Sequence, residues 1–93
     1  MEVERKIEGG KILKIKLWAR QGKVEKIRFT GDFFVIPERA VNSLEEHLVN
    51  LELREQKLIE TMVKEALSNA DLVGVRKKDF VELILEGLRR LDS

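Results

Sequence analysis

The sequence offers few side chains suited to catalysis, and Asp32 is the one whose neighbours set it apart. It stands in the stretch RFTGDFF, residues 28–34. The preceding Gly31 permits backbone angles that other residues avoid, and an aspartate there can hydrogen-bond neighbouring amides. A catalytic role would need a nucleophile, a base and an orienting group, and the sequence assembles no such set around Asp32. Two interpretations stay open: Asp32 braces a turn, or it belongs to a loop presented to a partner.

His47 is the only histidine, and it adjoins Glu45 and Glu46. Three consecutive residues of a helix point in different directions, so these side chains cannot converge on one metal ion. The chain contains no cysteine, which excludes disulfides, thiolate metal sites and cysteine nucleophiles. We therefore expect no metal site, and we interpret His47 as a partly exposed structural residue.

A basic segment raises the possibility of nucleic-acid binding, because Lys14, Lys16 and Arg20 flank Trp18. Bases can stack on an aromatic ring while cations neutralise phosphates, so a single-strand nucleic-acid-binding module is an alternative function. The whole chain, however, carries 18 basic and 17 acidic residues, and so lacks a field of one sign. We expect this strand face to be solvated and the partner to be no nucleic acid. An exposed Trp18 would be a candidate anchor in a protein interface.

The basic segment lies in a predicted β-hairpin. Apolar side chains recur at every second position before the Gln21-Gly22 turn, at Leu13, Ile15, Leu17 and Ala19. A three-residue loop, residues 21–23, sets Leu17 opposite Ile27 and Ile15 opposite Phe29, which keeps the apolar side chains on one face. A weaker alternation from Val3 to Ile7, before Gly9-Gly10, predicts a third, shorter strand.

Helical spacing follows the strands. Pro37 suits the first turn of a helix that we expect to run to about Asn50. Apolar residues at helical intervals predict a second helix over residues 58–70 and a third over residues 80–91, separated by the glycine-broken stretch 71–75. This order predicts an α+β fold, in which three helices cover a small antiparallel sheet of two to three strands at the N-terminus. We expect a single domain over residues 1–93.

The composition also bears on cellular location. No apolar run follows Met1, and no apolar stretch of membrane-spanning length occurs in the sequence. We therefore expect a cytoplasmic protein that makes no use of a membrane. Charged residues account for 38% of the chain and are mostly Lys, Arg and Glu, a composition typical of thermophilic proteins.

The adjacent phenylalanines Phe33 and Phe34 cannot both enter one core from a regular strand, because successive side chains point to opposite faces. Strand parity continued from Phe29 through Gly31 places Phe33 with the core and leaves Phe34 outward. An outward aromatic side chain is suited to anchoring an interface. The candidate interface residues are therefore Gly31, Asp32, Phe33 and Phe34, together with Trp18.

These same residues carry a family resemblance. The run GKVEKIRFTGDFF, residues 22–34, is preceded by Gly9-Gly10-Lys11 and followed by Pro37-Glu38. This pattern resembles the C-terminal accessory domain of lipoate–protein ligases, in which a GGK segment and a strand lead to GDFF and a helix that begins with proline. The resemblance extends to Val73-Gly74-Val75 before the last helix, so it covers most of the chain.

The resemblance implies a function and a partner. In the family this domain usually follows a catalytic domain that binds lipoate and ATP. Here the pattern begins at Met1, which resembles the small subunit of the two-component ligases found in some archaea. Such a subunit is non-catalytic alone and is required with the catalytic subunit for forming lipoyl-adenylate, before transfer to a lysine of a lipoyl acceptor domain. Lipoate, ATP and Mg²⁺ would then lie in the partner's active site, with no cofactor on this chain alone.

Two other interpretations are kept. The stretch GKVEKIRFTG is also similar to the iron–sulfur scaffold fold of the NifU and SufE type. Asp32 and Phe33 stand where a scaffold would need thiolates, so this similarity implies a shared fold without cluster assembly. A stand-alone enzyme using acidic residues would need a pocket lined by Asp32 and a second titratable group.

Overall fold

The computed structural model describes residues 1–92 and shows an α+β fold, as the sequence predicted. Its elements, in chain order, are β1 (Glu2–Lys6), a short 3₁₀ segment (Glu8–Gly10), β2 (Ile12–Arg20), β3 (Lys23–Gly31), β4 (Phe34–Ile36), α1 (Arg39–Leu48), α2 (Ile59–Ala66), β5 (Asp71–Val73) and α3 (Lys77–Asp92). Within the described residues, no helix has both the length and the apolar character needed to cross a membrane.

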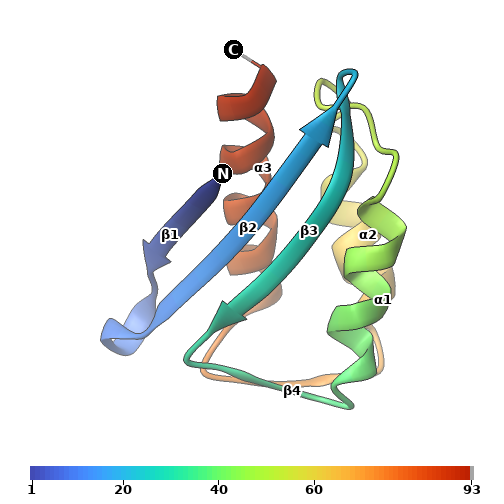
Figure 1. Ribbon diagram of the computed structural model, residues 1–93. Helices are drawn as coiled ribbons and strands as arrows, with labels where there is room; N and C mark the ends of the chain where they lie inside the picture. The colour runs from blue at the N-terminus through green and yellow to red at the C-terminus, as the bar shows by residue number, and fades with distance from the viewer. Residues whose placement is uncertain (93) are drawn as a thin grey trace.

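The main sheet is antiparallel, with strand order β1-β2-β3, and all three helices lie on one side of it (Figure 1). Helix α3 packs on β1 and β2, α1 packs on β3, and α2 lies against both α1 and α3. The side of the sheet that faces the helices is apolar and buried, with Val3, Leu13, Ile15, Leu17, Val24, Ile27 and Phe29. This layer of strands and the helices behind it form one hydrophobic core.

The hairpin keeps the predicted apolar register through a different turn. Leu17 faces Ile27 and Ile15 faces Phe29, as expected, but Arg20 pairs with Lys23, so the predicted three-residue loop is wrong. Gln21 and Gly22 both have positive φ, the backbone of a two-residue turn whose twist matches the strands. A register shift between Trp18 and Ala19 leaves Glu25 as an extra residue on β3. This bulge restores the apolar alignment that the two-residue turn alone would have lost.

The outer edge of β3 is covered by the segments that follow it. Val24 donates its N–H to the carbonyl of Leu51 and accepts an N–H from Asn50, both at 2.8 Å. Further along the edge, the N–H of Phe29 donates to Glu45 Oε2 at 2.8 Å. Glu45 is buried in α1, so it completes the sheet edge, a role the sequence did not reveal. An uncovered edge of this kind is a template for pairing with other chains.

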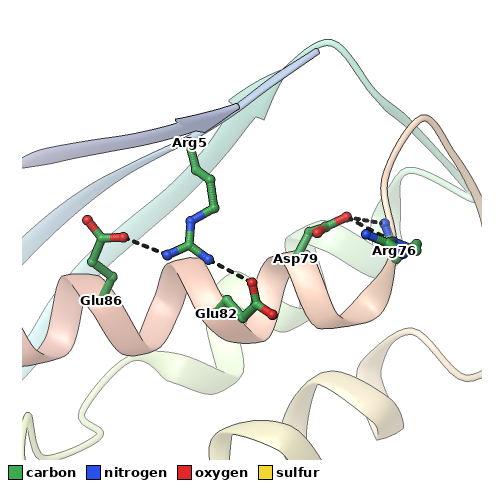
Figure 2. Close-up of polar contacts among 5 residues, drawn as sticks. All are labelled: Arg5, Arg76, Asp79, Glu82 and Glu86. Carbon is green, nitrogen blue, oxygen red and sulfur yellow. Dashed lines mark hydrogen bonds and ion pairs between the residues drawn. The ribbon is translucent and has the colours of Figure 1, made fainter. Parts of the chain in front are cut away.

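Strand β1 is tied to α3 by one arginine (Figure 2). Arg5 lies between Val3 and Ile7 in the alternation, and its guanidinium contacts Glu82 at 2.7 Å and Glu86 at 2.9 Å. These groups are partly exposed, so each pair contributes little to stability, but together they orient the edge strand over the helix. At the start of α3, the Arg76 N–H donates to Asp79 Oδ2 at 2.8 Å, which caps the helix.

A second sheet, absent from the sequence prediction, lies at the end of the molecule away from the β2–β3 turn (Figure 1). Strands β4 and β5 pair antiparallel, with Phe34 opposite Val73 and Ile36 opposite Asp71. Each strand has three residues, too few for a periodic pattern to reveal them. The helices also differ at their ends: α1 spans Arg39–Leu48 rather than residues 37–50, because Val49 is extended and Asn50 pairs with β3.

The edge contact of Glu45 yields a stability prediction. Glu45→Ala leaves the N–H of Phe29 without its acceptor in a buried position, so we expect a loss of about 1 to 3 kcal/mol in the free energy of unfolding. Glu45→Gln keeps an acceptor oxygen and should lose less. The exposed neighbour is the matched control, and Glu46→Ala should change stability by no more than about 0.5 kcal/mol. Urea unfolding followed by circular dichroism measures all three; equal stability of Glu45→Ala and Glu46→Ala would contradict the assignment.

Candidate protein interface

The GDFF segment begins where the chain leaves the main sheet. Gly31 pairs with Leu13 and has φ of 145°, in the region that favours glycine. A Cβ atom added to Gly31 would lie 2.2 Å from the carbonyl oxygen of Ile12, so no larger residue fits at this approach. The N–H of Asp32 donates to that carbonyl oxygen at 2.9 Å, and the N–H of Ile12 donates to Asp32 Oδ2 at 3.2 Å. Asp32 therefore braces the turn, the structural interpretation of the two left open.

The two phenylalanines separate as strand parity predicted. Phe33 is half-buried, and its ring stands edge-on to Phe80 with 5.5 Å between ring centroids. Phe29 meets the same Phe80 ring edge-on at 5.2 Å, so Phe33 belongs to the core. Phe34 is 71% exposed. The structure thus leaves one aromatic side chain at the surface, directly beside one that packs on the core.

Two further apolar side chains that the sequence analysis did not single out accompany Phe34. On the same side of the β4–β5 ribbon, Ile36 is 59% and Val73 is 50% exposed. The opposite side of the ribbon is packed on the core through Val35 and Leu72. The only sequence signal for this surface was the unbroken apolar run of residues 33–36. The rest of the surface comes from β5, which is far from that run in the sequence.

Trp18 does not join this group. It lies on the uncovered side of the main sheet near the β2–β3 turn, whereas β4 lies at the other end of the molecule (Figure 1). Trp18 is 40% exposed, and Lys26 Nζ lies 5.0 Å from the centre of its ring. On the same face, Lys14 contacts Glu2 at 3.7 Å and Glu4 at 3.6 Å. The basic face is therefore partly neutralised by the carboxylates of β1.

The consecutive residues Glu45, Glu46 and His47 do not converge on one point, as helical geometry predicted. Glu45 points to the sheet edge, while the exposed His47 has its Nδ1 atom 3.4 Å from Ser43 Oγ. Over residues 1–92, no group of three or more His, Asp or Glu side chains is arranged to hold a metal ion. Ser43 also lines a groove of about 560 Å³ between α1 and α2, whose walls mix small, polar and oppositely charged residues. Neither place assembles a set of catalytic groups.

The close approach at Gly31 gives a second prediction. Gly31→Ala introduces both a strained φ and a clash with the Ile12 carbonyl, so we expect it to lower the free energy of unfolding by about 3 kcal/mol or more. Gly10 is the matched control, because its φ is also positive at 76° but a Cβ there meets open space. Gly10→Ala should cost only about 1 to 2 kcal/mol. Thermal and urea unfolding compare the two, and equal losses would contradict the steric argument.

The basic face gives a third prediction. Because the carboxylates of β1 partly neutralise this face and the whole chain carries nearly equal numbers of basic and acidic residues, we expect binding to single-stranded DNA or RNA to be no tighter than about 100 µM at about 0.15 M salt. Trp18→Ala should leave this weak binding unchanged. Fluorescence titration with a labelled oligonucleotide measures both variants. Sub-micromolar binding that is lost in Trp18→Ala would show that the basic face recognises nucleic acid.

Comparison with known proteins bears on the fold and on the family of this chain. A search of curated proteins found no match. Among solved structures, the chain is similar to a chain from "Structural analysis of an archaeal lipoylation system. A bi-partite lipoate protein ligase and its E2 lipoyl domain from Thermoplasma acidophilum". The TM-score is 0.70 at 20% identity, with 90% of this chain and 97% of that chain covered, which establishes a shared fold. The family model described as bacterial lipoate protein ligase C-terminus matches residues 1–84, and the chain therefore belongs to that family.

Proposed function

We propose that this protein is the accessory subunit of a two-component lipoate–protein ligase, a single accessory domain over residues 1–93 that works with a separate catalytic subunit. The observation that carries the proposal is the similarity to a solved chain from a bi-partite lipoate protein ligase system, of which 97% is covered. The family match over residues 1–84 supports the same reading. The protein acts in the cytoplasm, and its partner is the catalytic subunit; lipoyl acceptor domains are reached through that subunit.

The proposed role lies in the first half of the reaction. Lipoate and ATP form lipoyl-adenylate with release of pyrophosphate, and the lipoyl group then passes to a lysine of an acceptor domain with release of AMP. Two acidic side chains that the sequence singled out already serve the fold: Asp32 accepts a hydrogen bond from the Ile12 N–H, and Glu45 accepts one from the Phe29 N–H. In this proposal lipoate, ATP and Mg²⁺ bind the catalytic subunit, and this chain contributes by binding that subunit.

The candidate interface residues of the GDFF segment have two different roles in this proposal. Gly31, Asp32 and Phe33 hold the junction between the sheets, and Phe34 is the side chain that faces solvent. An accessory subunit that stabilises the adenylate-forming conformation of its partner needs a rigid contact of this kind, because ordering the contact surface during binding would cost free energy. Phe34 thus makes the contact in this proposal, and the other three residues position it.

The proposed function is tested by pyrophosphate release. With lipoate, ATP and Mg²⁺, we expect no release from this chain alone, and a rate from the mixture of both subunits that exceeds the catalytic subunit alone by at least about tenfold, a coupling of about 1.4 kcal/mol. The catalytic subunit is taken from the same source. Release by the isolated chain that disappears in Asp32→Ala would show an active site here and refute the proposal. Equal rates with and without this chain would refute it as well.

A further inference from the structure

The outward side of the β4–β5 ribbon is a largely apolar surface exposed to solvent. We define the ribbon face as Phe34, Ile36, Asp71 and Val73, which strand pairing places on one side. Its three apolar residues are each at least half exposed, while their neighbours Val35 and Leu72 pack inward. Clustered apolar side chains that contact water are typical of a surface that another protein covers.

A hollow adjoins the ribbon face. It measures about 250 Å³ and lies between β4 and the first turns of α1, with Phe29, Phe33 and Val41 among its walls. Phe34 and Ile36 border the hollow, and Glu38 and Asn42 add polar groups to its lining. The surface therefore combines projecting apolar side chains with a recess that can receive one. Residues that dominate binding energy characteristically fill pockets of this sort.

The ribbon face is held in place before any partner binds. Phe33, directly before Phe34, is packed edge-on against the fully buried Phe80. At the same end, Asp32 is tied to Ile12 by a main-chain and a side-chain hydrogen bond. A surface that is already ordered loses little conformational entropy on association. The ribbon is therefore an ordered surface, suited to docking, and not a mobile loop that would have to become ordered on binding.

The charges around the ribbon face select its partner. Asp71 lies on the face, Glu38 lines the hollow, and Asp32 stands at the end beside Phe34. Lys11 lies at that end against Gly74, and Arg39 lines the separate groove between α1 and α2. In a symmetric dimer formed through this face, acidic groups of one copy would lie opposite acidic groups of the other copy, which is unfavourable. The complementary occupant is a different protein with an apolar centre and a basic rim.

We propose that the ribbon face is the surface on which the catalytic subunit docks. In this arrangement an apolar side chain of that subunit enters the hollow beside Phe34, and its Lys or Arg side chains lie opposite Asp71 and Glu38. The inference rests on the proposed function for the identity of the partner. It adds Ile36 from the same strand and Val73 from β5, and the sign of charge that the partner must present.

The test is calorimetric titration of the catalytic subunit with variants of this chain. Phe34→Ala should weaken binding roughly 5- to 150-fold. Leu58→Ala is the matched control, because Leu58 is 51% exposed but lies at the start of α2, away from the ribbon, and it should bind like wild type. Asp71→Lys should weaken binding most at low salt, and Asp92→Lys, near the β2–β3 turn, is its control. Thermal unfolding of each isolated variant should match wild type.

The results of these titrations distinguish failure of the ribbon-face inference from failure of the proposed function. If wild type stimulates the catalytic subunit while Phe34→Ala and Asp71→Lys bind as tightly as their controls, the function stands and the ribbon face is overturned. If wild type neither binds nor stimulates, the function itself fails. Unfolding of the isolated Phe34→Ala chain would place Phe34 in the core and overturn the inference. Wild-type dimers in sedimentation that dissociate in Phe34→Ala would make a second copy the occupant and overturn it too.

Discussion

The close approach of Gly31 to the carbonyl oxygen of Ile12 determines the structure of the end of the molecule that carries β4 and β5. Only a residue without a Cβ allows β3 to end so near β2. The paired hydrogen bonds between Ile12 and Asp32 then fix the direction in which the chain leaves the sheet. Because β4 starts two residues later and α1 follows it, this one contact sets where the ribbon lies and where the first helix begins.

A ring cluster extends that constraint into the core. Phe29 from β3 and Phe33 from the junction both stand edge-on to Phe80 of α3. An isolated pair of three-residue strands is marginal in water, so the β4–β5 ribbon depends on such packing and on the buried Val35 for its order. The last helix and the GDFF segment, distant in sequence, are in this way parts of one structural unit.

The sequence predicted those features that depend on periodicity. The alternation in the hairpin gave the correct apolar pairs, and the helical spacing located all three helices, because burial of one face imposes these periods. It gave the wrong turn, because a bulge at Glu25 leaves no trace in an alternation that resumes afterwards. It missed β5, because three residues show no period, and it missed the role of Glu45, because a carboxylate that completes a sheet edge looks like any helix-face glutamate. Within the candidate site, parity placed Phe33 and Phe34 correctly, while the wide separation of Trp18 from them needed the three-dimensional fold.

The residues that build the fold and those offered to a partner are separate sets. The backbone of Gly31 and the side chains of Asp32 and Phe33 contact the protein's own backbone and core, whereas Phe34, Ile36 and Val73 are exposed to water. Within the ribbon, strand alternation produces the division, since Val35 and Leu72 point inward between outward neighbours. An apolar face obtained in this way costs the core little, because Val35 and Leu72 still fill their inward positions. The outward residues are then free to match a partner in shape and charge without altering the junction that carries them.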